Sequence, residues 1–221
     1  MVLKEKDFIE IEFTGKIKNG DIFDSNIKSD IEKANLKTTA KPFIFSLGQG
    51  MFLRGIDDFL IGKEIGKQYH LELNAEKAFG NRDPKLVQIV PPSVFRQHKL
   101  NPFPGAMFNF DGRIAKVLSV SGGRVRVDFN NPLAGKDLEY DLKINRKLED
   151  INEKIKSFID FLFRKNFRFE IKDKELSIFV EKQLINLVTL FKDKFKDLFN
   201  LNLNVIEEKE TDKNKSKENK E

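Results

Sequence analysis

Residues 9–24 read IEIEFTGKIKNGDIFD, and this stretch decides the fold class. Apolar and polar residues alternate from Ile9 to Gly15, which is typical of a strand with one buried face. Asn19-Gly20 then separates this strand from the apolar pair Ile22-Phe23. Because both positions of a tight hairpin turn favour positive φ, Asn-Gly is a strong hairpin signal. The sequence therefore predicts a β-hairpin at this point.

Three further elements are expected in the first eighty residues. Residues 43–48 and 68–73 predict strands, and residues 55–61 predict a short helix that Gly62 stops. Antiparallel strands that surround one short helix are typical of an α+β domain, which we therefore predict.

The pattern changes near residue 84. Residues 106–110, 113–120 and 124–129 are strand candidates separated by glycine-containing turns, and Pro91-Pro92 ends any regular ladder before them. We therefore expect a small β module over residues 84–130, after which the first domain resumes with a strand at 138–144.

The segment 148–206 alternates between helical and strand periodicity. Helical spacing over 151–162 and 184–199, with strand patterns over 167–171, 176–180 and 201–205, predicts an αββαβ module. The apolar face of its second helix is wider than one core contact needs, so we expect self-association, with another binding partner as the alternative. Residues 207–221 contain no apolar side chain, and we expect a disordered charged tail.

Composition excludes several classes of site. The chain has 221 residues, of which 39% are hydrophobic and 34% are charged, as in globular proteins with a sizeable core. It has no cysteine and two histidines, which excludes disulfides, thiolate zinc sites, a cysteine nucleophile and a three-histidine metal site. We expect no metal and no cofactor. The net charge of +5 is modest, and no basic stripe with interleaved aromatics stands out, so we expect no nucleic-acid partner.

Location is inferred from what the sequence lacks. No apolar run approaches the roughly 20 residues of a membrane span, and the first residues lack the apolar region of a signal peptide. We expect a cytoplasmic protein that does not bind membranes. The high Lys and Glu content and the absence of cysteine are typical of proteins from thermophiles. The 22 Phe residues are explained equally well by codon bias.

Conventional catalytic motifs are missing from the sequence. It has no Gly-x-Ser-x-Gly, Walker or Rossmann pattern, and Gly48-Gln49-Gly50 predicts only a turn. We expect His70 and His98 to be solvated, and Asp57-Asp58 to be exposed helix charges because adjacent helix residues do not face each other. What remains is a set of aromatic side chains in the first domain and the carboxylate of Asp24. The aromatics are either simple core or the walls of an apolar pocket.

Separated motifs in the first domain resemble FKBP-type peptidyl-prolyl cis-trans isomerases. In chain order they are Phe13-Thr14-Gly15, Asn19-Gly20, Phe23-Asp24-Ser25, Lys41-Pro42-Phe43-Ile44-Phe45, Leu47-Gly48, Leu53-Arg54-Gly55-Ile56 and Lys77-Ala78-Phe79-Gly80. Residues 86–91 and 130–138 resemble the SlyD branch, in which a chaperone module called the insert-in-flap is spliced into the flap loop. Residues 148–206 resemble the extra C-terminal domain of long archaeal members.

The resemblance implies an FKBP-type antiparallel β-sheet wrapped on a short helix. Residues 1–83 and 131–147 would form this isomerase domain, and residues 84–130 the insert-in-flap chaperone domain. The implied activity is isomerisation of X–Pro bonds in unfolded or nascent polypeptides, with ATP-independent chaperone activity from the insert. The apolar face of residues 184–199 leads us to expect a homodimer through the C-terminal domain. The histidine-rich metal-binding tail of some SlyD proteins is absent.

The resemblance also implies roles for individual residues. Asp24 would orient the twisting amide, Leu53 would offer its N–H to the substrate carbonyl, and Ile56 stands where many members carry Trp. Phe13 and Phe79 stand where Tyr is common, so two hydroxyls near Asp24 are missing and we expect a slower or differently selective enzyme. The implied substrate-binding residues are Phe23, Phe43, Phe52, Ile56 and Tyr140. The alternative is a holdase chaperone or adaptor with a weak or decayed isomerase site.

The insert carries more apolar residues than a module of 47 residues hides easily. These residues are Leu86, Val87, Ile89, Val90, Val94, Phe95, Phe103, Met107, Phe108 and Phe110. Either they form a compact internal core, or part of them is exposed and binds unfolded chains.

Overall fold

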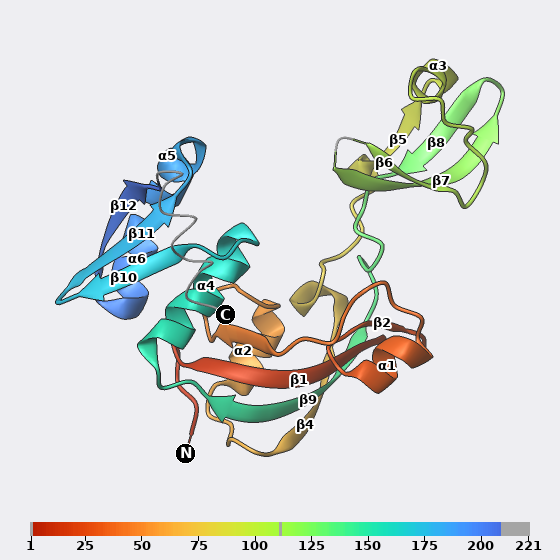
Figure 1. The fold of residues 1–221 in the computed structure, drawn as a ribbon. Coiled ribbons are helices and arrows are strands. Elements are labelled where there is room, and N and C mark those ends of the chain that lie inside the picture. The colour runs from red at the N-terminus through yellow and green to blue at the C-terminus, as the bar shows by residue number, and fades with distance from the viewer. Residues whose placement is uncertain (1, 111, 209–221) are drawn as a thin grey trace.

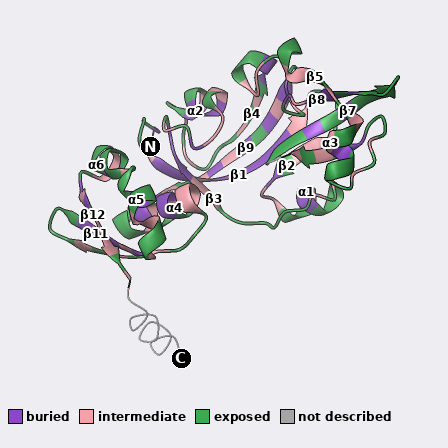
Figure 2. Ribbon diagram, turned by 90° about the horizontal axis from the view of Figure 1, so that it is seen from above, coloured by how far each residue is buried: buried purple, intermediate pink, exposed green. Residues whose placement is uncertain are grey.

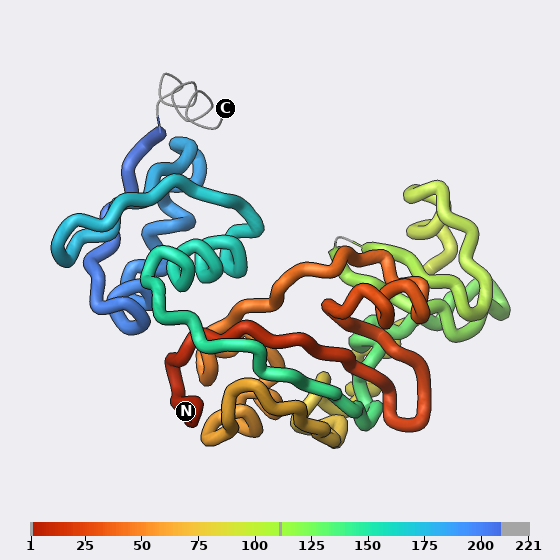
Figure 3. Tube along the Cα trace, turned by 60° about the horizontal axis from the view of Figure 1, so that its bottom comes forward, coloured from red at the N-terminus to blue at the C-terminus, as the bar shows by residue number. Residues whose placement is uncertain are grey.

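A computed structural model describes residues 2–110 and 112–208 of the chain. The described residues form three sheets, and each sheet belongs to a different part of the sequence. Figure 1 shows the insert module at the end of two connectors and the C-terminal module at the opposite end of the first domain. The tube view of Figure 3 likewise places these two modules at opposite ends of the first domain.

The first sheet is antiparallel, with the order β2-β1-β9-β4, and β3 also pairs with β1. Its central strand β9 lies after the insert in the sequence, so the chain leaves the sheet and returns to its middle. The strands are β1 (Phe8–Ile17), β2 (Ile22–Ser25), β3 (Phe43–Ser46), β4 (Gln68–Leu73) and β9 (Leu138–Lys147). The short helices of this domain are α1 (Lys28–Lys33), α2 (Arg54–Leu60) and the 3₁₀ turn η1 (Ala75–Lys77). This α+β arrangement agrees with the predicted fold class.

The first hairpin forms where the sequence predicted it, but its turn differs from the expectation. Asn19 has a φ of 57°, whereas Gly20 does not adopt positive φ. The Gly20 N–H donates to the carbonyl of Ile17 at 2.7 Å, so the turn spans residues 17–20 and needs positive φ only at its third residue.

The two faces of the first sheet differ in polarity. Helix α2 covers one face, where Ile56 and Leu60 are fully buried. The other face carries ion pairs between neighbouring strands, including one from Lys143 to Glu12 at 3.1 Å. His70, predicted to be solvated, is exposed on this face with its Nδ1 2.8 Å from Oδ1 of Asp141.

The insert module has its own sheet and its own core. Its antiparallel order is β5-β8-β7-β6, formed by β5 (Val87–Val90), β6 (Met107–Phe110), β7 (Arg113–Ser121) and β8 (Arg124–Asp128). The 3₁₀ turn η2 (Pro84–Leu86) precedes it. The sequence did not predict the short helix α3 (Pro92–Gln97), which starts with a proline in its first turn, where the missing N–H is not needed. Its Phe95 is fully buried and contacts Phe108 and Phe110.

The C-terminal module contains three strands and three α-helices. They are α4 (Ile151–Phe163), β10 (Arg168–Lys172), β11 (Glu175–Val180), α5 (Ile185–Thr189), α6 (Lys192–Phe199) and β12 (Asn202–Glu207), with a 3₁₀ turn η3 (Lys182–Leu184) before α5. β10 pairs with β11 in antiparallel fashion, and β11 pairs with β12 in parallel.

The single helix predicted over 184–199 is wrong, because the chain breaks between α5 and α6. The Thr189 hydroxyl donates to the carbonyl of Ile185 at 2.7 Å, a contact that often bends helices. At Phe191 the backbone has φ −92° and ψ 8°, outside the helical range. The change of direction lets Phe191 contact Phe163 while Phe195 contacts Phe158.

The end of β12 lies inside the segment predicted to be a charged tail. The parallel ladder pairs Val180 with Glu207, and the Glu208 N–H donates to Val180 at 2.9 Å. Backbone pairing needs no apolar side chain, which is why composition placed the boundary too early. The rest of the predicted tail, 209–221, lies outside the described residues.

The C-terminal module and the first sheet share one apolar core. The ring of Phe8 lies 5.5 Å from that of Phe199, and the Leu148 N–H donates to the carbonyl of Phe8 at 2.8 Å. Lys6 and Asp197 add an ion pair of 2.5 Å at the edge of this contact. Figure 2 shows buried residues in β1, β9 and α4, whereas the insert has a separate buried cluster.

Candidate active site

One cluster of contacting aromatic rings lies on the α2 side of the first sheet. Its members are Phe13, Phe23, Phe43, Phe45, Phe52, Phe79 and Tyr140. All of them except Phe45 are residues that the resemblance placed in a site. The sheet therefore brings together side chains that lie more than one hundred residues apart.

The rings meet mostly edge to face, which is a favourable arrangement for aromatic side chains. Phe52 lies at the centre, with its centroid 4.9 Å from Phe43, 5.2 Å from Phe13 and 5.9 Å from Tyr140. Phe13 and Tyr140 are almost fully buried, whereas Phe23, Phe43, Phe52 and Phe79 are half-buried. The cluster is thus a closed apolar back wall with partly accessible rings in front.

Gly15 makes this packing possible, a role that its motif alone did not indicate. It pairs with Asp24 on β2 and with Tyr140 on β9. A Cβ atom at Gly15 would lie 2.8 Å from Phe23 Cζ and 2.8 Å from Tyr140 Cε1, closer than real Cβ contacts. A glycine is therefore required where the two rings cross the strand.

Asp24 is the carboxylate beside the cluster. The residue is exposed overall, but packing against apolar side chains removes part of its hydration and raises the pKa of its carboxyl, opposed by a hydrogen bond from the Ser25 N–H. The pKa of Tyr140 is raised as well, first by burial and then by the charge of Asp24. The negative charge of Asp24 is thus close enough to disfavour the phenolate form of Tyr140.

Leu53 and Ile56 lie at the start of helix α2, in the same apolar core as the rings. The Leu53 carbonyl accepts from the N–H groups of Ile56 at 2.8 Å and Asp57 at 3.1 Å. Among the described residues, the Leu53 N–H has no acceptor. Ile56 is fully buried and belongs to the same apolar core as the ring cluster.

Asp57 is buried, so its interpretation as an exposed helix charge is wrong, whereas Asp58 is exposed. Its carboxyl accepts from the N–H groups of Gly48 and Gly50, which replace water as its partners. Oδ1 has no partner among the described residues. Burial raises the pKa of Asp57 to about 6. This side chain holds the loop that leads directly to Phe52 and Leu53.

The described residues offer few other kinds of site. Within 2–110 and 112–208, no group of three or more His, Asp or Glu could hold a metal ion. In the same part of the chain, no helix is long and apolar enough to cross a membrane.

Two family models match the chain. The model of the FKBP-type peptidyl-prolyl cis-trans isomerase matches residues 2–96, and a model described as the IF domain of FKBP26 matches residues 88–133. The first match contains most of the ring cluster, and the second coincides with the insert module.

Curated relatives carry isomerase names. A short-type peptidyl-prolyl cis-trans isomerase of Methanocaldococcus jannaschii is 28% identical over 147 residues, which cover 65% of this chain and 92% of that protein. A probable FKBP-type 16 kDa peptidyl-prolyl cis-trans isomerase of Pseudomonas fluorescens is 32% identical over 139 residues, covering 62% of this chain and 85% of that protein. The FKBP-type isomerase SlyD of Aeromonas hydrophila is 26% identical over 138 residues, which cover 62% of this chain and 60% of that protein.

The aromatic cluster, the carboxylate beside it and these matches agree with one another. The chain belongs to the family of FKBP-type peptidyl-prolyl cis-trans isomerases and is an enzyme of that class.

Proposed function

We propose that the X–Pro bond of a polypeptide isomerises against the aromatic cluster, with Asp24 at its edge. Rotation about this amide has a barrier of about 18–20 kcal/mol and takes tens to hundreds of seconds unaided. The reaction needs no nucleophile, because a site that favours the twisted amide over the planar one is sufficient. Apolar walls contribute by excluding the water that stabilises the planar, charge-separated amide.

The geometry suggests a role for each group. The half-buried rings of Phe23, Phe43 and Phe52 would hold the proline ring above Ile56 and Tyr140. The Leu53 N–H, which lacks an acceptor among the described residues, would donate to a substrate carbonyl. The observation that carries the proposal is the position of Asp24 and Tyr140, which lie opposite Gly15 on its two neighbouring strands, at the aromatic cluster.

Phe13 and Phe79 belong to the proposed site, but they lack the hydroxyl group of the tyrosines that are common at these positions in the family. One hydrogen bond contributes about 0.5–1.5 kcal/mol. The proposed enzyme is therefore active but slower, or differently selective, than a site with both hydroxyls.

We also propose that the insert module is an insert-in-flap chaperone domain that captures unfolded chains. Of its apolar residues, Phe95 is buried, whereas Ile89, Phe103 and Met107 are 63%, 60% and 54% exposed. Exposed apolar groups of this kind favour binding to other chains. Capture beside the active site would raise the local concentration of prolines there.

The test for catalysis is the refolding of a proline-limited, disulfide-free protein with catalytic amounts of the full chain. We expect acceleration by the wild type and a sharp loss in Asp24→Ala, while Asp21→Ala in the exposed hairpin turn serves as the control. Acceleration that Asp24→Ala leaves unchanged would remove our role for this carboxylate. Absence of acceleration, with aggregation still suppressed at stoichiometric amounts, would instead support the holdase alternative.

The test for capture compares a tetrapeptide with an unfolded protein as substrate. The double variant Ile89→Ser, Met107→Ser should lose most of its activity on the protein and keep its activity on the tetrapeptide. Equal losses on both substrates would contradict the chaperone role.

Self-association through residues 184–199 remains a proposal with a smaller surface than expected. Most apolar residues of this segment pack inside the module, and the exposed ones are Leu187 at 45% and Leu190 at 80%. Sedimentation of the full chain against Leu190→Asp tests the proposal, since a dimer through this face should dissociate in the variant.

A further inference from the structure

The positive charge of the chain is concentrated in the insert module. Residues 84–130 contain seven Lys and Arg against two Asp, an excess equal to the net +5 of the entire chain. One of these acids, Asp128, is almost fully buried and pairs with Arg82. The other, Asp111, lies outside the described residues. The described surface of the insert is therefore basic.

Three of these cations lie on one face of the insert sheet together with apolar side chains. In β8 the exposed Arg124 and Arg126 alternate with the buried Val125 and Val127. Residues directly opposite each other in a ladder share a face, and Ile89 on β5 is opposite Arg126.

The same face continues on the other two strands. Met107 on β6 is opposite Lys116 on β7, and Ile114 lies two residues before Lys116 on the same strand. All three are exposed. Helix α3 covers the other face of the sheet, because its Phe95 packs against Phe108 and Phe110. We call the exposed face, formed by Ile89, Met107, Ile114, Lys116, Arg124 and Arg126, the basic–apolar face.

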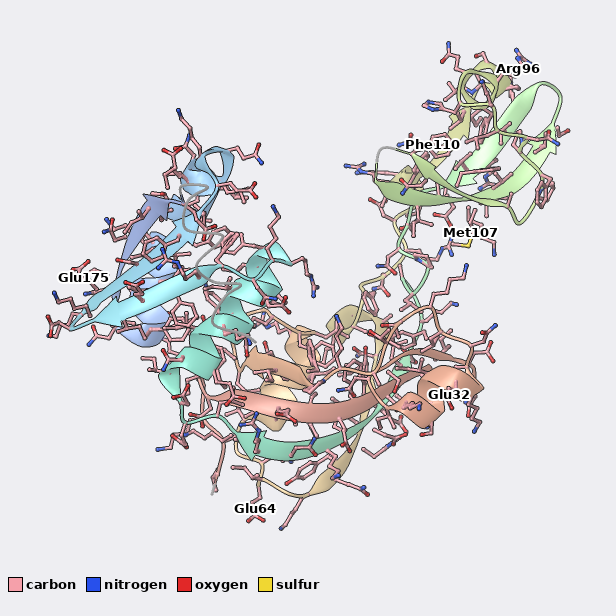
Figure 4. All side chains as sticks on the ribbon, in the orientation of Figure 1. Glu32, Glu64, Arg96, Met107, Phe110 and Glu175 are labelled. Atoms are coloured by element: carbon pink, nitrogen blue, oxygen red, sulfur yellow. The ribbon has the colours of Figure 1, made fainter. Side chains whose placement is uncertain are left out.

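The basic–apolar face is directed toward the isomerase domain. Figure 4 shows the Met107 side chain on the side of the insert that faces the first sheet, whereas Arg96 of α3 lies on the far side. At the foot of the face, a hollow of about 210 Å³ is lined by Met107, Ile114, Lys116 and Asp128 of the insert sheet, and by Lys136 of the adjoining segment. Asp128 does not offset these cations, since Arg82 and the Asn130 amide take up its oxygens.

We propose that the basic–apolar face selects unfolded segments in which acidic residues alternate with apolar ones. This inference rests on the chaperone role proposed above and names its substrate class. An extended chain alternates its side chains as a strand does, so carboxylates and apolar groups of one segment match Arg124, Arg126 and Lys116 beside Ile89 and Met107. Opposite charge across such a contact gives selectivity and faster association.

Single-stranded nucleic acid is the competing polyanion, and the face suits it less well. Bases bind to proteins by stacking on aromatic rings, and the basic–apolar face contains only aliphatic residues and methionine between its cations. The exposed aromatic Phe103 lies in the loop before β6, outside this face.

The test uses three labelled, unstructured peptides with the same apolar residues, alternating with Glu, Gln or Lys. Binding to the full-length protein is measured by fluorescence anisotropy at 50 mM and 500 mM salt. Because several exposed ion pairs each contribute a little, we expect the Glu peptide to bind about tenfold more tightly than the Gln peptide at low salt. Screening should reduce this difference to about twofold at high salt.

Two double variants locate the selectivity. Arg124→Gln with Arg126→Gln should remove the preference for the Glu peptide and leave Gln-peptide binding and tetrapeptide isomerisation unchanged, which also shows that the variant is folded. Arg96→Gln with Lys99→Gln removes the same charge outside the face and should keep the preference.

The outcomes separate this inference from the function on which it rests. Equal binding of the Glu and Gln peptides would overturn the acidic selectivity and leave the chaperone role intact. Failure of all three peptides to bind would remove the chaperone role itself. Polyuridylate and unlabelled Glu peptide are compared as competitors of the labelled Glu peptide. If polyuridylate displaces the labelled peptide at a lower concentration of negative charges than unlabelled Glu peptide does, the face binds nucleic acid and the inference is overturned.

Discussion

The side-chain amide of Asn130 holds the backbone of Asp83 through two hydrogen bonds. Its Oδ1 accepts from the Asp83 N–H at 2.8 Å, and its Nδ2 donates to the Asp83 carbonyl at 3.0 Å. The two connectors of the insert module are thus joined by an amide that imitates one rung of a β-ladder. Nδ2 also donates to Asp128 Oδ1 at 2.7 Å, and Arg82 pairs with the other oxygen of that carboxylate. With Asn130 only 7% exposed, water has little access to these groups.

Asn130→Ala should loosen the insert relative to the isomerase domain. The change leaves the Asp83 backbone groups without their partner, at a cost of about 1–3 kcal/mol. We expect faster amide hydrogen exchange at Asp83 and a lower isomerisation rate on an unfolded protein, with an unchanged rate on a tetrapeptide. Asn131→Ala is the control, because the exposed Asn131 side chain only accepts from the nearby Leu133 N–H. Unchanged exchange together with an unchanged protein rate would show that Asn130 does not position the insert.

Gly15→Ala should disturb the active site without touching a polar group. The new Cβ displaces the rings of Phe23 and Tyr140, and overpacking of this kind costs about 1–3 kcal/mol. We expect a lower free energy of unfolding and a lower kcat/KM for a tetrapeptide. Gly20→Ala in the same hairpin, where the nearest contact of the added Cβ is 3.2 Å, should change the rate little. A rate in Gly15→Ala equal to that of the wild type would mean that the two rings do not form the substrate wall.

Phe79→Tyr should raise the rate. The ring of Phe79 lies 6.3 Å from that of Phe23 beside the proposed site, and a hydroxyl there would restore one hydrogen-bonding group. A gain of about 0.5–1.5 kcal/mol in the transition state corresponds to roughly twofold to tenfold in tetrapeptide kcat/KM. Because Phe103 is exposed in the insert module, away from the aromatic cluster, Phe103→Tyr serves as the control. No change in Phe79→Tyr would count against our account of the missing hydroxyls.

Asp57→Asn should change how stability depends on pH. Burial raises the pKa of Asp57 from 3.8 to about 6, so between these values the folded protein binds more protons than the unfolded chain. The protonated Asp57 carboxyl makes its full contribution to the free energy of unfolding below pH 3.8, and this contribution is lost as the pH rises through 6. This loss amounts to about 3 kcal/mol at most.

Denaturant unfolding of Asp57→Asn from pH 4 to pH 8 tests this dependence. The variant should lack the decline that the wild type shows over this range, and Asp58→Asn, an exposed neighbour, should retain it. Parallel curves for the wild type and Asp57→Asn would contradict the assignment.

The sequence predicted the parts of the fold that depend on local pattern. The alternation from Ile9 to Gly15 and the turn at Asn19 are short-range features, so the first hairpin and its sheet were predictable. The aromatic residues of the site were identified through motifs whose spacing matches a family. Their contacts confirm that these residues meet in one cluster, in which Phe13, Phe52 and Tyr140 contact one another.

Other features depend on tertiary contacts that no local pattern contains. Asp57 and Asp58 are identical residues, and only the position of the loop at Gly48 decides which one is buried. The helix break at Phe191 accompanies the contact of its ring with Phe163, a residue far away in the sequence. The cations of the insert alternate with apolar residues along the chain, and the ladder of β5, β8, β7 and β6 brings them to one face.

The contact between Phe8 and Phe199 has a consequence for the structural independence of the modules. A module with a core of its own, like the insert, can be exchanged or lost while the rest of the chain keeps its shape. The C-terminal module lacks this independence, since its removal would leave Phe8 and Leu148 uncovered. We therefore expect the C-terminal module and the first sheet to unfold as one unit, whereas the insert can unfold separately.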